Sequence, residues 1–263
     1  MYQFRLGCIS TVKIGCIIPA HLKSVRFPKK ILYKIYGLEM IEHVRRRALL
    51  SLQLNKRVYV ASGDPSILTV VKKNKGKVIK TLQNHQNGTS RVAEALKKTN
   101  FTHVIILQGD EPLIYPKYID KFIMEIKKDK NNNIDCWNLV SPITNYKDLQ
   151  KKSFVKTKLT KYNYIKSLDR IYDKKEKKNV YKILGLIALK KDAILKLIKI
   201  KPSPNEKKKY IEQLRIIEND MILKGVKVKQ ALPSINEKKD LKKVLEVLDN
   251  NKSQQKIFNK IIT

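Results

Sequence analysis

Short strand-like runs alternate with helix-like segments along this 263-residue chain. Apolar runs that are short and rich in β-branched residues predict strands at residues 13–19, 57–61, 77–80, 104–110, 135–141 and 183–189. Apolar residues at helical spacing predict helices at residues 40–54, 64–74, 90–98, 116–128, 206–220 and 240–248. Such alternation builds βαβ units, so we predict an α/β fold with a mostly parallel central sheet and helices on both faces.

The middle of the chain has a different pattern. It predicts a small β-ribbon at residues 154–160 and 163–168, followed by a lysine-rich turn at 173–179. Neither an internal repeat nor a linker rich in Gly, Pro or Ser divides the chain. We therefore predict a single domain over residues 12–249, with an N-terminal extension at 1–11 and a frayed C-terminal tail at 250–263.

The chain is strongly basic, with a formal charge of +34 from 57 basic and 23 acidic residues. Such an excess favours an anionic partner such as nucleic acid or anionic lipid. However, 48 of the basic residues are lysines spread over nearly the whole length, whereas nucleic-acid readers concentrate arginine and aromatic residues on one face. We therefore interpret most lysines as a solvated coat and expect no specific nucleic-acid partner.

Cysteine and hydropathy patterns indicate the compartment. Cys8, Cys16 and Cys136 are odd in number and lack C-x-x-C spacing, which argues against a disulfide framework and against a zinc site. The apolar run at residues 14–20 is too short for a membrane span or a signal peptide. We expect a cytoplasmic protein without an integral membrane segment.

One predicted strand ends in acidic residues. The run Val104-Ile105-Ile106-Leu107-Gln108-Gly109-Asp110-Glu111-Pro112 closes with two carboxylates and a proline. A parallel strand delivers its last residues to the carboxyl edge of the sheet, where open α/β folds bind ligands. Asp110 is therefore placed to hold a metal ion or a hydroxyl group. Taken alone, the two carboxylates fit equally well the role of capping the next helix.

Two polar loops are predicted at the same edge. The loop at residues 19–30 carries four Lys and Arg side chains within eight residues, and such cations hold a triphosphate even without a P-loop pattern. The loop at residues 84–91 offers amides and hydroxyls to a base edge, and it opens a helix whose N-terminus favours an anion. An accidental charge cluster and a plain helix cap are the simpler alternatives.

Four ordered motifs together resemble the CMP-Kdo synthetases, the 3-deoxy-manno-octulosonate cytidylyltransferases. They are I-I-P-A-x-x-x-S-x-R-x-P-x-K, M-I-E-H-V, H-Q-N-G-T-S-R-V-A-E and Q-G-D-E-P-L-I, and they extend from Ile17 to about Ile114. Farther on, Pro202-Ser203-Pro204 with Glu206, and Glu212-Gln213-Leu214-Arg215, are similar to the family's S-P-x-E and E-Q-L-R segments. The resemblance implies a Rossmann-like nucleotidyltransferase fold.

The resemblance also implies an activity. The expected reaction is transfer of CMP from CTP to the anomeric hydroxyl of a 3-deoxy-2-ulosonic acid, Kdo or a related acidic sugar, with Mg²⁺ as cofactor and pyrophosphate as product. The CMP-sugar would serve lipopolysaccharide or surface-polysaccharide synthesis. A homodimer is implied as well, with the ribbon at residues 142–182 at or near the interface.

Specific residues match the family's functional positions. The catalytic residues implied are Arg26, Lys30 and Asp110. The nucleotide-binding residues implied are Pro19, Ala20, His21, Ser24, Arg26, Lys30, Ala61, Ser62, His85, Gly88, Thr89 and Gln108. The sugar-binding residues implied are Arg91, Glu212 and Gln213, and the metal ligands implied are Asp110 and Asn236.

Departures from the family pattern lie mainly in the sugar half. His21 replaces an arginine, Lys29 replaces a glycine, and Lys166-Ser167-Leu168 and Ile183-Leu184-Gly185 stand where the family has F-S-R and H-L-G. Asn236 replaces the second metal carboxylate, and an amide without formal charge holds Mg²⁺ less well.

These departures leave three explanations open. The acceptor is a different acidic or amino-modified sugar, Glu237 or Asn236 covers for the lost carboxylate, or the chain is a weakened homologue that only binds CTP. A basic protein that binds nucleic acid or an anionic membrane is the alternative from another functional class.

Overall fold

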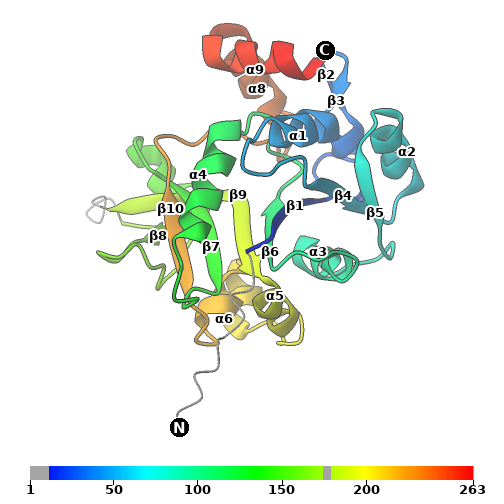
Figure 1. Ribbon diagram of the computed structural model, residues 1–263. Helices are drawn as coiled ribbons and strands as arrows, with labels where there is room; N and C mark the ends of the chain where they lie inside the picture. The colour runs from blue at the N-terminus through cyan, green and yellow to red at the C-terminus, as the bar shows by residue number, and fades with distance from the viewer. Residues whose placement is uncertain (1–11, 174–178, 263) are drawn as a thin grey trace.

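The computed structural model describes residues 12–173 and 179–262 (Figure 1). Its central sheet has the strand order β10-β7-β9-β6-β1-β4-β5, with β8 paired to β9. The strands of this sheet are β1 (Ile14–Pro19), β4 (Val58–Ser62), β5 (Lys77–Lys80), β6 (His103–Leu107), β7 (Cys136–Pro142), β8 (Lys156–Lys158), β9 (Val180–Lys190) and β10 (Leu223–Lys227). A separate hairpin pairs β2 (Lys34–Ile35) with β3 (Leu38–Glu39).

Strand direction determines where the site lies. β1 is parallel to β4 and β6, β4 is parallel to β5, and β7 is parallel to β10. β9 runs antiparallel between β6 and β7, so that β7 and β10 share the direction of β1. The predicted mostly parallel α/β sheet is confirmed, and the carboxyl ends of β1, β4, β5, β6, β7 and β10 meet at one edge.

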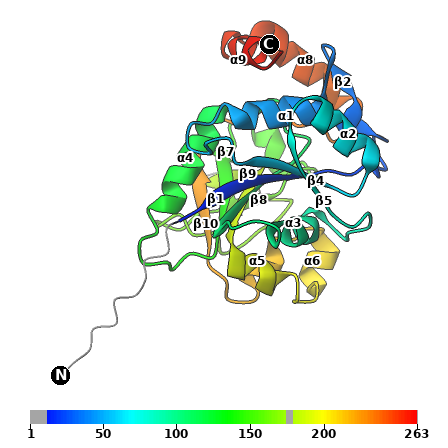
Figure 2. The ribbon, with the colours of Figure 1, turned by 45° about the vertical axis from the view of Figure 1, so that its right-hand side comes forward.

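Helices cover both faces of the sheet (Figure 2). Helices α1 (Met40–Leu49), α2 (Pro65–Lys73), α4 (Pro116–Lys127) and α8 (Asp240–Asn250) contribute to one apolar core, and α3 (Gly88–Leu96) and α5 (Lys191–Leu197) to the other. Residues of β1 alternate between these cores, with Ile14, Cys16 and Ile18 in the first and Ile17 in the second. In the described part of the chain, no helix is long and apolar enough to cross a membrane.

The prediction of one helix over residues 206–220 was wrong. The chain forms α6 (Pro204–Lys209) and α7 (Leu214–Ile217), separated at Tyr210, whose φ of 54° is left-handed. Ser203 caps α6, because its side chain accepts from Glu206 N at 3.0 Å. The break lets Arg215 Nε donate to Glu206 Oε2 at 2.7 Å, forming a buried ion pair that a continuous helix would not favour.

The prediction of a frayed tail was also wrong for most of its length. Residues Lys252–Ile262 form α9, which packs on α1 and α8. Gln254 is fully buried, accepts from Arg47 Nη1 at 2.7 Å and donates to the Leu113 carbonyl oxygen at 2.9 Å. Tertiary contacts of this buried side chain therefore hold a segment that was expected to fray.

The predicted ribbon is only partly formed. β8 pairs with β9 rather than with residues 163–168, which contribute the isolated bridge between Leu159 and Ile165. A short 3-10 helix, η2 (Tyr146–Gln150), precedes it. Most of the lysine-rich turn predicted at residues 173–179 lies outside the described residues.

Candidate active site at the carboxyl edge of the sheet

The loop at residues 19–30, which we call the cationic turn, follows β1 and lies against the end of β6. Lys30, which opens the 3-10 helix η1 (Lys30–Leu32), donates from Nζ to Asp110 Oδ2 at 2.7 Å. The next residue, Ile31, lies so close to Gly109 that a Cβ atom at position 109 would be 2.8 Å from its Cδ1 atom. Glycine at this position therefore lets the turn approach the strand end, and the structure joins two segments that the sequence predicted at one edge.

A third segment, after β10, completes this cluster. Ile235 N donates to the Asp110 carbonyl oxygen at 2.9 Å, and the Ile235 carbonyl oxygen accepts from Lys30 Nζ at 3.0 Å. Asn236, the predicted second metal ligand, follows directly, and its amide donates to Ser234 Oγ at 3.3 Å. Asn236 and Asp110 are therefore brought to the same place from opposite halves of the chain.

Arg26 lies at the exposed rim of the cluster. Its Nη1 atom is 3.5 Å from Glu237 Oε1, and Glu237 also pairs with Lys239 at 2.7 Å. The Arg26 side chain is 59% exposed, so this pair is weak and the guanidinium is available to an incoming anion. Glu237 is thus an ion-pair partner of the cationic turn. Its role as a substitute metal ligand stays a hypothesis.

The ends of β1 and β4 carry other residues that were predicted to bind nucleotide. Ala20 N, directly after Pro19, donates to the Ala61 carbonyl oxygen at 2.9 Å, and Ser62 Oγ accepts from Asp64 N at 3.1 Å. Asp64 stands at the N-cap position of α2, but its side chain makes no capping bond and instead accepts from Leu22 N at 3.1 Å. Asp64 thereby fixes the start of the cationic turn, a role that no local pattern indicates.

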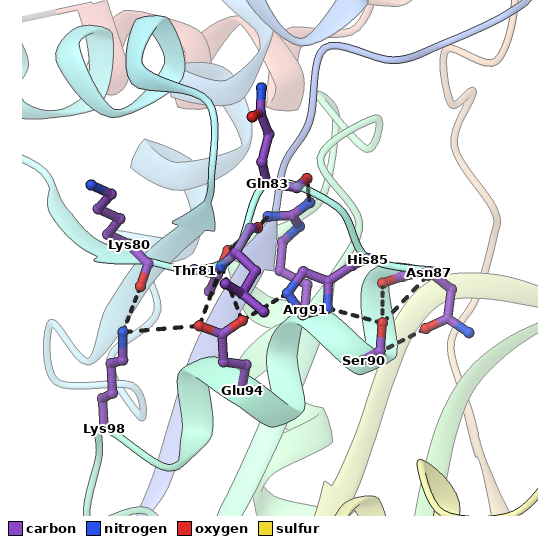
Figure 3. Close-up of polar contacts among 10 residues, drawn as sticks. Lys80, Thr81, Gln83, His85, Asn87, Ser90, Arg91, Glu94 and Lys98 are labelled. Atoms are coloured by element: carbon purple, nitrogen blue, oxygen red, sulfur yellow. Dashed lines mark hydrogen bonds and ion pairs between the residues drawn. The ribbon is translucent and has the colours of Figure 1, made fainter.

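The loop after β5 is held largely by side chains of helix α3 (Figure 3). His85 contacts Ser90 Oγ through Nδ1 at 3.2 Å and Glu94 Oε2 through Nε2 at 2.8 Å. The buried Arg91 donates to Thr81 Oγ1 at 2.7 Å and to the carbonyl oxygens of residues 82 and 83. His85 was predicted to contact nucleotide and Arg91 to contact sugar. In the ligand-free protein both side chains form hydrogen bonds that hold the loop in place.

This loop borders a polar cavity. Asn87 caps α3 by accepting from Ser90 N at 2.8 Å, and Gly88 lies against Pro19, whose Cγ atom would be 3.2 Å from a Cβ at position 88. A cavity of about 260 Å³ lies beside the cap. Its lining consists of His21, Lys23, Asp64, Gln83, Asn84, His85, Gln86, Asn87 and Arg91.

His21 is an exposed member of that lining. Partial desolvation and the positive charge of Arg91 lower the pKa of the His21 imidazole. The ring is therefore neutral at pH 7 in the ligand-free protein.

The predicted sugar-side residues lie across from the loop. Glu212 accepts from Asn87 Nδ2 at 2.9 Å and from Thr89 Oγ1 at 3.0 Å, and burial raises the pKa of its carboxyl group. Gln213 Nε2 lies 3.4 Å from Asn138 Oδ1 in β7. Thr89 and Glu212, predicted for different substrates, are hydrogen-bonded to each other, so the two sides of the site are in contact.

Two ionisable residues at this edge were not among the predicted site residues. Burial, followed by the charge of Asp110, raises the pKa of Glu111 to about 8, and its carboxylate lies beside Gly185. Lys182 in β9 lies near it, with Nζ 3.8 Å from the centre of the Phe154 ring, and burial lowers its pKa. The motif D-E-P points to Glu111, but only the antiparallel course of β9 brings Lys182 to this edge.

Comparison with known proteins identifies the family. The cytidylyltransferase family model matches residues 15–228. The 3-deoxy-manno-octulosonate cytidylyltransferase of Elusimicrobium minutum is 30% identical over 243 residues, covering 89% of this chain and 98% of that protein. The protein of the same name from Fusobacterium nucleatum is 32% identical over 240 residues, covering 89% and 96%. This chain belongs to the cytidylyltransferase family.

Solved structures agree with this membership. CMP:2-keto-3-deoxy-manno-octonic acid synthetase complexed with CTP superimposes on this cytidylyltransferase with a TM-score of 0.84 at 28% identity, covering 90% of this chain and 98% of that one. The 4-diphosphocytidyl-2C-methyl-D-erythritol synthase of Anaerococcus prevotii has a TM-score of 0.62 at 14% identity, covering 92% and 98%, and shares the fold. The predicted nucleotidyltransferase fold is therefore confirmed.

The remaining predicted residues have distinct positions in this cytidylyltransferase. Gln108 is exposed at the end of β6, with its backbone N donating to the Gly185 carbonyl oxygen at 3.0 Å. Ser24 is half-buried in the cationic turn. The contacts of both side chains with substrate stay predictions.

Proposed function

We propose that this protein transfers CMP from CTP to a 3-deoxy-2-ulosonic acid, with Kdo as the first candidate, and releases pyrophosphate. Relatives that match nearly their whole length bear the name of this activity, and a solved relative of similar fold is complexed with CTP. The observation that carries the proposal is the meeting of Lys30, Asp110 and Ile235 at the carboxyl edge, beside a polar cavity. Family membership favours this enzyme over a basic protein that binds nucleic acid or membrane.

The reaction needs charge neutralisation and alignment. The anomeric oxygen of the sugar acid forms a bond to the α-phosphorus of CTP, the bond to the pyrophosphate oxygen breaks, and the hydroxyl proton passes to solvent. Arg26 and Lys30 lie where they can hold the phosphates, and positioned cations stabilise the charge that develops during such a transfer. Glu212 is proposed to face the sugar acid from the opposite side.

The residues present fit Mg²⁺ as the cofactor. Asp110 Oδ2 and the Ile235 carbonyl oxygen converge on one cation, the Lys30 ammonium, and this convergence of two hard oxygen atoms on a positive charge supports a cation site here. Among the described residues no group of three His, Cys, Asp or Glu side chains could hold a metal. This agrees with Mg²⁺, which takes one or two carboxylates and completes its shell with substrate phosphates and water. When bound, Mg²⁺ would neutralise phosphate charge, with Asp110 and Asn236 as its protein ligands.

Pyrophosphate release tests the proposed function. Purified protein with CTP, Mg²⁺ and Kdo should release pyrophosphate, and omission of any one should abolish release. A panel that includes other 3-deoxy-ulosonic and sialic-type acids identifies the acceptor. CTP binding without release for every acid would instead support the weakened homologue, and no CTP binding would refute the proposal. Steeply salt-dependent affinity for nucleic acid that CTP does not change would support the alternative from the other class.

Substitution of Asn236 by aspartate should strengthen metal binding. Restoring a formal charge beside Asp110 should lower the Mg²⁺ concentration for half-maximal rate about three- to tenfold. Asn131→Asp, at an exposed position in the turn before β7, is the matched control and should leave this concentration unchanged. An unchanged Mg²⁺ requirement in Asn236→Asp would mean that another group, such as Glu237, already provides the charge.

CTP affinity should depend on pH through His21. The ring is neutral in the free protein because its pKa is lowered, whereas a bound triphosphate raises that pKa, so CTP binding takes up a proton. The contribution of His21 to CTP affinity should therefore grow as pH falls from about 8 towards 5, and this contribution should disappear as pH rises. Calorimetric titrations of wild type and His21→Arg separate this effect from ionisation of CTP itself, because only the wild type carries the imidazole. Parallel pH profiles of the two proteins would contradict the prediction.

The biological setting is part of the same proposal. We propose a cytoplasmic homodimer that supplies lipopolysaccharide or surface-polysaccharide synthesis, with residues 142–182 near the dimer interface. Exposed apolar side chains on this extension, Tyr162 at 63% and Ile171 at 44%, support the interface. Light scattering of the wild type against Tyr162→Lys would test it.

A further inference from the structure

One ammonium group is held by segments far apart in the chain. Lys30 Nζ donates to Asp110 Oδ2 at 2.7 Å and to the Ile235 carbonyl oxygen at 3.0 Å. The bond from Ile235 N to the Asp110 carbonyl oxygen fixes these two oxygen ligands side by side. We call this position, between Asp110 Oδ2 and the Ile235 carbonyl oxygen, the cation seat.

The cation seat is sheltered enough for its occupant to matter. The side chains of Lys30 and Asp110 are only 15% and 23% exposed. Charge-assisted hydrogen bonds of this length are stronger than neutral ones, and partly buried pairs are less screened by salt than exposed pairs. A divalent ion approaching Asp110 in the ligand-free protein therefore meets a carboxylate already paired and a positive charge beside it.

The same lysine belongs to the cationic turn that faces the phosphates. A triphosphate presents more negative charge to the Lys30 ammonium than one carboxylate does. CTP therefore competes with Asp110 for this ammonium, and when it succeeds it leaves Asp110 unpaired.

We propose that Lys30 fills the cation seat in the nucleotide-free protein, and that CTP opens the seat for the metal by drawing the ammonium to its phosphates. Metal binding at Asp110 then depends on the nucleotide, and by linkage the metal strengthens nucleotide binding by the same factor. This inference rests on the proposed function, because it takes CTP as the nucleotide and Asp110 as the metal ligand.

Binding of Mn²⁺ without nucleotide tests the inference. The electron paramagnetic resonance signal of free Mn²⁺ measures binding to wild type, to Lys30→Met and to Lys34→Met. Lys34 is an exposed lysine nearby that pairs with Glu39 at 3.8 Å, so Lys34→Met is the matched control. Lys30→Met should bind Mn²⁺ at least about tenfold more tightly than wild type and control, because the competing ammonium is gone. The double variant Lys30→Met, Asp110→Asn should lose this gain.

Other outcomes overturn the inference. It fails if wild type without CTP binds Mn²⁺ as tightly as Lys30→Met, or if CTP does not enhance Mn²⁺ binding to the wild type. Lys30→Gln, compared by circular dichroism, replaces Lys30→Met if the latter does not fold. The proposed function is judged separately by pyrophosphate release, so CMP transfer by a wild type whose metal site is open without CTP would refute only the cation seat.

Discussion

Replacement of Asp110 by asparagine should lower the rate of CMP transfer about a hundred- to a thousandfold, the loss typical when a preorganised electrostatic group of an active site is removed. Asp110 is the carboxylate around which Lys30 and Ile235 gather, and Asn236 beside it carries no charge. The variant would leave Mg²⁺ with amide oxygens alone on the protein side, and these hold it weakly. Pyrophosphate release at saturating CTP and Kdo measures the effect.

The matched control is Asp192→Asn, at an exposed position in the first turn of α5. Like Asp110→Asn, it removes one carboxylate charge, but it does so away from the carboxyl edge of the sheet. This variant should keep the wild-type rate. A rate for Asp110→Asn within tenfold of the wild type, with folding unchanged, would remove Asp110 from the mechanism.

Substitution of Arg215 by methionine should reduce the free energy of unfolding by about 3–5 kcal/mol, the usual cost of breaking a buried ion pair on one side. Arg215 pairs with Glu206 through two hydrogen bonds, one of them 2.7 Å long, and the two side chains are only 6% and 10% exposed. Loss of the guanidinium leaves the Glu206 carboxylate buried without its main partner. Because this pair connects α6 to α7, on either side of Glu212, acceptor binding should weaken as well.

Urea denaturation measures the loss, and two further variants interpret it. Glu206→Gln combined with Arg215→Met should cost less than the sum of the single changes, because neither charge is then left alone. Lys128→Met breaks the ion pair between Lys128 and Glu125, in which the Lys128 side chain is 66% exposed. This change should reduce the free energy of unfolding by less than about 1 kcal/mol. Equal costs for Arg215→Met and Lys128→Met would show that the buried pair does not hold this region.

The sequence was sufficient to predict the sheet edge and to place the cationic turn and Asp110 at it. Hydrophobic runs located most strands, and strands that run parallel must end together, so the cationic turn and Asp110 were expected at one edge. The structure then places Lys30 Nζ 2.7 Å from Asp110 Oδ2, which agrees with this expectation. Ordered motifs then supplied the family, which spacing alone does not.

Other features depend on contacts that local patterns do not contain. The direction of β9, and with it the position of Lys182, is set by pairing with β6 and β7. The left-handed residue Tyr210 divides a segment whose apolar spacing predicts one helix. The bond from Leu22 N to Asp64, and the packing of α9 through Gln254, join residues separated by 42 and 141 positions. None of these features can be found from the residues adjacent in the sequence alone.

The reversed strand β9 has a consequence for how this protein can evolve. Pro142 at the end of β7 is in register with Tyr181 near the start of β9, so the two ends of the intervening segment lie at neighbouring positions on one border of the sheet. Within that segment β8 pairs with β9, which ties the segment to the sheet in its middle as well. Insertions and deletions should therefore be tolerated in the connections on either side of β8, where strand order does not depend on their length, and not within β8 itself.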